Sequence, residues 1–143
     1  MSNKKSVIQW LAWFFAFNFL FIFLISHWPG LTDSQGRLLG LFYIDPIDDI
    51  FHLFSGLMAA GAGVASHRWS VRYFKWFGIP YGLDAITGLF FSREFLNGGV
   101  FKGLGSSDFS MHNFLVNLPH IVILFSMLWI GFYLSKKIRD PQK

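Results

Sequence analysis

The feature that most constrains the fold is a series of long apolar runs separated by polar or glycine-rich segments. The first run, residues 7–28, contains no Asp, Glu, Lys or Arg. At 1.5 Å per residue, a helix of this length crosses a hydrocarbon core of about 30 Å. The run exceeds a signal-peptide core and is followed by His27-Trp28-Pro29 rather than by a small-residue cleavage site. We therefore expect an uncleaved first membrane span.

Three further runs suggest that the chain crosses the membrane four times. They cover about residues 48–66, 71–92 and 113–135. Only 14% of the 143 residues are charged, against about one-quarter in soluble domains, and the mean hydropathy is +0.44. The sequence predicts an all-α fold, a four-transmembrane-helix bundle that forms a single integral membrane domain over residues 1–143.

The distribution of Lys and Arg predicts the orientation. Four spans place both termini and the segment 67–72, expected to be a tight basic turn, on one side of the membrane. That side carries nine of the twelve basic residues. They are Lys4, Lys5, Arg68, Arg72, Lys75, Lys136, Lys137, Arg139 and Lys143. Because basic residues accumulate on the cytoplasmic side, both termini are expected in the cytoplasm.

Two halves of the chain have the same order of features. Residues 7–66 and 71–135 each comprise a span, a long loop, and a second span with an Asx residue three positions before a histidine. Asp49 precedes His52, and Asn117 precedes His120. Both halves enter from the same side, so we expect two parallel helical-hairpin repeats related by an axis along the membrane normal.

A polar intramembrane cluster is the candidate functional site. His52, Asp84 and His120 lie within about three turns of the outer ends of their spans, accompanied by Asp49 and Asn117. Ionisable residues inside a membrane are costly and are therefore candidates for function. The three ionisable groups are predicted to line one cavity in the outer half of the bundle.

Several interpretations of the two histidines remain open. Each histidine with its Asx neighbour forms a hydrogen-bonded polar pair that joins helices, or His52 and His120 are the axial ligands of a b-type haem. In the haem interpretation, the small residues Gly56, Ala59 and Gly63, on the same helical face as His52, provide the slot for the macrocycle.

Two further interpretations concern the carboxylates. Asp49 and Asp84 together with both histidines form a non-haem metal site, although no close ligand pair such as HxxxH is present. Alternatively, Asp84 has a structural partner, either a histidine or a hydroxyl such as that of Thr87. A third role for Asp84 is the handling of protons or ions.

Other classes of function lack support in the sequence. The chain has no cysteine, so disulfides and thiolate chemistry are excluded. No GxSxG, GxGxxG or phosphate-binding GxxxxGK pattern occurs. The basic residues flank apolar segments rather than forming a patch between aromatic residues, so nucleic acid is not an expected partner.

Short motifs in much of the chain resemble a family of small four-helix bacterial membrane proteins with paired N-x-x-H helices, catalogued only as a domain of unknown function. The matching residues are Gly40, Leu41, Phe42, Ile44 and Pro46; Asp49, His52, Leu53 and Gly56; Phe77, Gly78 and Tyr81; Asn117 and His120. The resemblance implies a four-helix fold and a location in the bacterial inner membrane. It implies no activity.

These patterns suggest three functions. The first is a structural or accessory role in contact with the lipid bilayer and with other membrane subunits, as part of a larger membrane complex. The second is a haem-binding or redox membrane protein that uses His52 and His120. The third is a small proton, ion or solute transporter that uses Asp84. Because no pattern points to a reaction, an enzymatic activity is not the favoured prediction.

Overall fold

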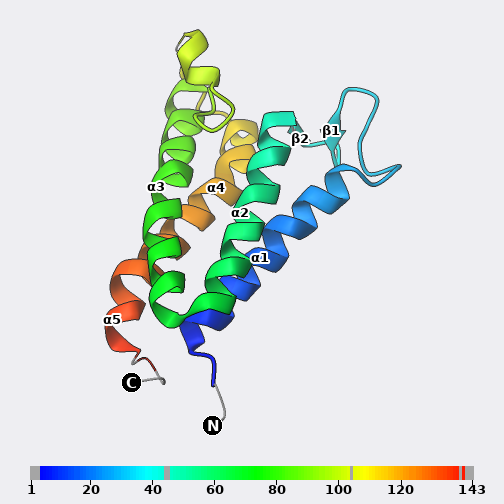
Figure 1. The fold of residues 1–143 in the computed structure, drawn as a ribbon. Helices are drawn as coiled ribbons and strands as arrows, with labels where there is room; N and C mark the ends of the chain where they lie inside the picture. The colour runs from blue at the N-terminus through cyan, green and yellow to red at the C-terminus, as the bar shows by residue number, and fades with distance from the viewer. Residues whose placement is uncertain (1–3, 44–45, 104, 139, 141–143) are drawn as a thin grey trace.

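The computed structural model describes residues 4–43, 46–103, 105–138 and 140. Ile44, Asp45, Arg139 and Lys143 lie outside the described residues. The described part is all-helical apart from one very small sheet, as predicted for the fold class. Its long helices lie side by side, with the two termini at one end and the long connecting segments at the other (Figure 1).

The element bounds agree closely with the predicted spans. The helices are α1 (Val7–Ser26), α2 (Pro46–Ala65), α3 (His67–Phe91), α4 (Met111–Leu128), the π-helix η2 (Trp129–Leu134) and α5 (Ser135–Lys137). The α1–α2 connection contains the antiparallel strands β1 (Arg37–Leu38) and β2 (Phe42–Tyr43). The α3–α4 connection contains the 3-10 helix η1 (Gly99–Lys102).

Local capping explains where the helices begin. Ser6 and Gln9 form a reciprocal capping box at the start of α1. Pro46 opens α2, at a position where its missing N–H costs nothing. The predicted turn at 67–72 is wrong, because Ser66 accepts a hydrogen bond from Trp69 N and starts α3 at His67. The basic residues there lie on the first turns of a helix.

The helices pack as two hairpins. α1 lies mainly against α2, and α3 mainly against α4, with α2 and α3 joining the two pairs. A Cβ at Gly56 would lie 2.7 Å from Leu20 Cγ, and one at Gly63 would lie 3.0 Å from Trp13 Cδ1. The small-residue face of α2, suggested above as the slot for a haem, is instead the surface on which α1 packs closely.

Buried polar groups also join α2 to α3. Ser55 Oγ lies 2.9 Å from the Tyr81 hydroxyl, and Tyr73 donates a 3.3 Å hydrogen bond to the Ser55 carbonyl. Nearer the other end, Ser70 donates to the Ala62 carbonyl at 3.0 Å. Because each group has a partner, the interface between α2 and α3 accommodates hydroxyls without a large cost of burial.

Two helical segments are long and apolar enough to cross a membrane. They are Val7–Ser26 and Met111–Lys137. α2 has 20 residues and α3 has 25, but both contain more small or polar residues and do not meet the same test. The described part of the chain is thus helical, and two of its helices are long and apolar enough to span a membrane.

Candidate ligand-binding site

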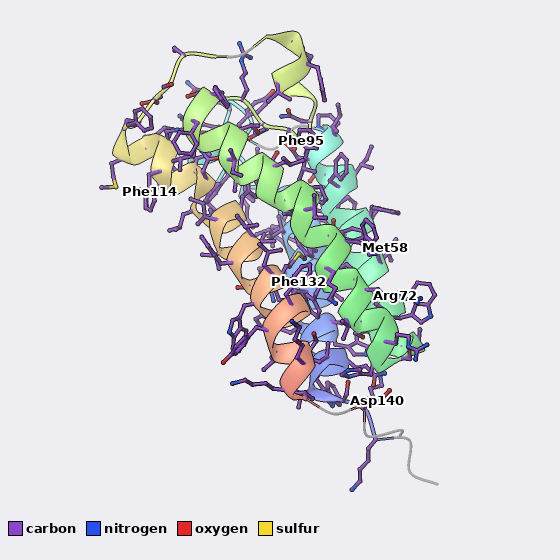
Figure 2. The ribbon with its side chains drawn as sticks, turned by 90° about the vertical axis from the view of Figure 1, so that its left-hand side faces the viewer. Met58, Arg72, Phe95, Phe114, Phe132 and Asp140 are labelled. Atoms are coloured by element: carbon purple, nitrogen blue, oxygen red, sulfur yellow. The ribbon has the colours of Figure 1, made fainter. Side chains whose placement is uncertain are left out.

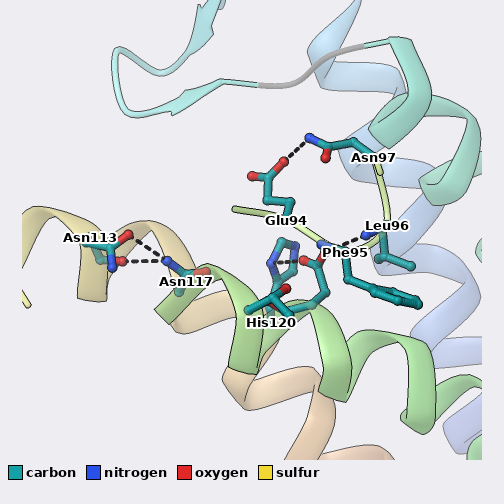
Figure 3. Close-up of polar contacts among 9 residues, drawn as sticks. Glu94, Phe95, Leu96, Asn97, Asn113, Asn117 and His120 are labelled. Carbon is teal, nitrogen blue, oxygen red and sulfur yellow. Dashed lines mark hydrogen bonds and ion pairs between the residues drawn. The ribbon is translucent and has the colours of Figure 1, made fainter. Parts of the chain in front are cut away.

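Asp84 is the centre of the site. Its side chain is 1% exposed, and it lies on α3 near the end of the bundle that carries the long connections. Oδ1 accepts two hydrogen bonds of 2.8 Å, from the backbone N–H groups of Phe95 and Leu96 (Figure 3). A buried carboxylate with such partners holds the connecting segment firmly against the helix.

The other Asp84 oxygen contacts His120 of α4. Oδ2 lies 2.8 Å from His120 Nδ1 (Figure 3). The ring N–H is not aligned with the carboxylate as a hydrogen bond requires, so the contact is electrostatic, with the distance of an ion pair. A carboxylate beside one ring nitrogen favours a proton there and fixes the orientation of the imidazole. Nε2 is then the nitrogen left for a ligand.

His52 reaches the same region from α2. Its Nδ1 is buried and has no hydrogen-bond partner among the described residues. Between the two histidines lie two core rings: Phe19 is 6.2 Å from the His52 ring and 5.2 Å from Tyr81, and Tyr81 is 6.3 Å from the His120 ring. The four rings form a continuous row of aromatic surfaces across the bundle.

Both imidazoles line one cavity of about 170 Å³. Its walls come from α1, α2 and α4, and the β1–β2 hairpin covers it. The apolar lining residues are Ile22, Ile25, Leu38, Leu39, Phe42, Val116 and Pro119. Asp48, Glu94 and Tyr43 add polar groups. The arrangement is an apolar chamber with two imidazoles and two carboxylates at its boundary, a typical composition for a small-molecule site.

Two members of the predicted cluster have other partners. Asp49 accepts a 2.6 Å hydrogen bond from Ser26 Oγ, and its other oxygen lies 3.7 Å from His27 Nε2. Asn117 donates to the Asn113 carbonyl at 2.8 Å and to Asn113 Oδ1 at 3.0 Å. Asp49 thus ties α1 to α2, while Asn117 makes its hydrogen bonds along α4.

Sequence reasoning missed the groups contributed by the connections. Glu94 of the α3–α4 connection lines the cavity together with Asp48 of the first turn of α2, and Phe95 and Leu96 supply the N–H groups that hold Asp84. Glu94 also accepts a hydrogen bond from Asn97 (Figure 3). The acidic residues near the loop ends could have indicated the cavity from the sequence. No sequence pattern marks the backbone N–H groups of Phe95 and Leu96 as donors to Asp84.

The geometry bears on the metal and haem hypotheses. Among the described residues, no three His, Asp or Glu side chains are placed to hold a metal ion together. The cavity is close in volume to the roughly 150 Å³ that accommodates benzene, whereas a haem is several times larger than one ring. The residues could supply two imidazoles to a haem, but the chamber as it stands does not fit the macrocycle.

Comparison with protein-family models, with curated proteins and with solved structures finds no match.

Proposed function

We propose that this is an integral protein of the bacterial inner membrane that crosses the bilayer four times, with both termini in the cytoplasm. Every long helix carries an outward stripe of large apolar side chains at intervals of three or four residues. Examples are Trp10, Phe14, Phe17, Phe21 and Leu24 on α1 and Trp76, Ile79, Leu83, Ile86 and Phe90 on α3. Exposed apolar patches of this extent are rare on soluble proteins, whereas they are expected on a surface that contacts lipid.

The absence of cysteine makes this topology straightforward to test. Gln35→Cys and Ser106→Cys introduce thiols into exposed positions of the two long connections, and Lys136→Cys introduces one near the C-terminus. In intact cells, a membrane-impermeant maleimide should label the first two variants only. Labelling of Lys136→Cys before lysis, or equal labelling of all three, would contradict the proposed orientation.

Within this membrane protein, we propose a binding site for a neutral ring-bearing ligand that partitions into lipid. The observation that carries the proposal is the presence of His52 and His120 on one apolar cavity. A volume of about 170 Å³ suits a single six-membered ring. The His52 imidazole can donate to an oxygen atom on such a ring, and the lining residue Phe42 offers an aromatic surface to it.

A quinone-type head group has this chemistry. Its carbonyl oxygens accept hydrogen bonds and carry no charge, and its apolar tail can remain among acyl chains. The unpartnered Nδ1 of His52 costs roughly 1–3 kcal/mol while it is buried. A ligand oxygen that pairs with this nitrogen after a small rotation of the ring removes that cost.

Calorimetric titration of the detergent-purified protein with a short-chain alkyl benzoquinone tests the proposal. His52→Phe keeps an aromatic ring and removes the hydrogen bond, and we expect about tenfold weaker binding. His112→Phe, at an exposed position outside the cavity, is the matched control and should bind like the wild type. Equal affinities of wild type and His52→Phe, or equal losses in both variants, would refute the site.

The haem hypothesis stays a prediction that one spectrum decides. A haem bound by His52 and His120 would give the purified protein an intense visible absorbance band, lost on substitution of either residue. Colourless protein from haem-sufficient cells would remove that hypothesis and leave the quinone-type site unaffected.

The other functional predictions also stay open to direct measurement. Transport through Asp84 predicts a liposome flux that vanishes in Asp84→Asn, although the three contacts of this carboxylate favour a structural role. An accessory role predicts that extraction in mild detergent yields a larger membrane assembly. A lone monomer would count against it.

A further inference from the structure

A second cavity lies at the opposite end of the bundle, beside the termini. It has a volume of about 600 Å³, and its wall includes Arg68 and Lys75 of α3 and Lys136 of α5. Ser135 adds a hydroxyl, and Asp140 adds one carboxylate. The lining therefore carries three basic side chains and one acidic side chain, a net positive cleft between two helices.

Local structure brings these cations together. The π-helix η2 precedes Ser135, and its wider turn changes the angular position of the residues that follow. Gly131 within it lets Lys75 approach closely, because a Cβ there would lie 3.0 Å from Lys75 Cγ. On the other wall, His67 Nδ1 lies 2.9 Å from Ser6 Oγ, which ties the start of α3 to the start of α1.

The cleft borders an apolar surface. The Lys75 ammonium group lies 5.1 Å from the centroid of the Phe132 ring, and Lys137 lies 4.5 Å from that of Tyr133. Phe132, Tyr133 and Trp129 are all exposed on the same end of the α4–η2 helix. Figure 2 shows Phe132 above Asp140 on this side of the molecule. Such a sequence of aromatic then basic side chains is typical of the boundary between acyl chains and head groups.

We propose that this cleft binds the phosphate group of an anionic phospholipid. Arg68 and Lys136 approach the phosphate from facing helices, Lys75 contributes a third charge from within the cleft, and the acyl chains lie along the exposed rings of η2. Basic pockets between helices on the cytoplasmic side are suited to such head groups. The proposal rests on the membrane location proposed above, but the site lies at the opposite end from His52 and His120 and is independent of the ligand proposed there.

The test compares two double variants that lose the same charge. Arg68→Gln/Lys136→Gln removes two cations of the cleft. Lys5→Gln/Arg72→Gln removes two cations from the same end that lie outside the cleft, over the Trp13 and Trp69 rings, each at 4.9 Å. Each protein is titrated in a neutral detergent with phosphatidylglycerol, phosphatidylcholine or inorganic phosphate, and bound lipid is counted by native mass spectrometry.

We expect the wild type to retain phosphatidylglycerol in preference to phosphatidylcholine. Affinity for phosphatidylglycerol should fall roughly tenfold in the cleft variant and remain close to wild type in the control. Equal losses in both variants would show a diffuse attraction and overturn the site. Displacement of phosphatidylglycerol by equimolar inorganic phosphate would overturn a lipid as the source of the phosphate group.

Discussion

At the scale of single residues, Asp84 joins three parts of the chain: α3, the α3–α4 connection and α4. One carboxylate holds the backbone of the α3–α4 connection through Phe95 and Leu96 and orients His120 on α4. Burial of an ionised group is tolerated only where such partners surround it. The residue therefore couples the connecting segment to the imidazole that lines the cavity.

Two substitutions separate these contributions. Asp84→Asn retains an oxygen for both backbone N–H groups but loses the charge opposite His120. Asp84→Ala loses all three contacts, and we expect it to lower the free energy of unfolding by roughly 3–5 kcal/mol. Asp84→Asn should cost clearly less. Unfolding by SDS from mixed micelles measures both, and equal losses would show that the backbone contacts contribute little.

Asp33 lies in the α1–α2 connection, which covers the cavity. The backbone N–H of Arg37 donates to this carboxylate at 2.9 Å and, aided by the Arg37 guanidinium and the Gln35 N–H, holds the pKa of Asp33 below its ordinary value. The stabilisation is thus present above the ordinary carboxyl pKa and is lost as the pH falls through the lowered value.

Hydrogen exchange reports this change directly. Once corrected for the intrinsic pH dependence of exchange, protection of residues 35–39 should fall on acidification below pH 4. Asp33→Asn should have low protection throughout and little further response to acid. Acid-induced loss of the same size in Asp33→Asn would assign the effect to another group.

At the scale of elements, close contacts at glycine set how the helices pair. Gly88 of α3 faces Asn117 of α4, and a Cβ at this glycine would overlap the amide side chain. Gly82 faces Leu124 in the same interface, where a Cβ would lie 2.6 Å from Leu124 Cδ1. Backbones that approach so closely gain dispersion contacts, which are the main source of helix association in lipid.

Alanine substitution provides a matched pair of variants. Gly88→Ala should lower the free energy of unfolding by about 1–3 kcal/mol, because Asn117 must move to admit the methyl group. Gly61→Ala, on α2, introduces a methyl group with no atom within 4 Å and should be neutral or slightly stabilising. Thermal unfolding in detergent measures both. A loss in Gly61→Ala equal to that in Gly88→Ala would argue against close packing as the cause.

The elements also show what could be predicted from the sequence. The apolar runs allowed the long helices to be predicted. The small-residue face of α2 could be predicted from the helical spacing of its residues. Both features belong to a single segment of the chain. The sequence suggested either a histidine or a hydroxyl as a structural partner of Asp84. In the structure, the side chain in contact with its Oδ2 is that of His120. The β1–β2 hairpin has strands of only two residues, which are too short to show an alternating pattern. The π-helix and the N–H groups of Phe95 and Leu96 contact α3, and such contacts between distant segments leave no periodic pattern in the chain.

At the scale of the whole molecule, large apolar side chains project outward from all four long helices as well as inward. The core combines apolar residues such as Phe19 and Phe74 with buried polar ones such as Gln9, Ser55, Ser70, Asp84 and Asn117. Many other phenylalanines and tryptophans are exposed. With this surface in lipid, as proposed, the stability of the bundle is expected to depend on the surrounding apolar medium as well as on the packed core.

A charge placed on this surface should affect insertion rather than folding. Phe125→Asp, on the outward face of α4, should oppose insertion by roughly 2.5–3.5 kcal/mol if that position lies near the middle of the bilayer. Phe101→Asp, at an equally exposed ring in η1, should be well tolerated. The fraction of each protein in carbonate-washed membranes is the readout. Equal membrane fractions for both variants would argue against α4 as a lipid-facing span.

The cover over the cavity has a consequence for access. The β1–β2 hairpin lies over the chamber, and Asp84 holds the neighbouring segment in place through two backbone contacts. Glu94 lines the chamber directly before that segment, so entry past it from the aqueous side would break the two backbone contacts of Asp84. We therefore expect a lipid-soluble ligand to enter laterally, between the helices. Occupancy would then follow how strongly the compound dissolves in the bilayer, and two compounds at equal aqueous concentration would saturate the protein to very different degrees.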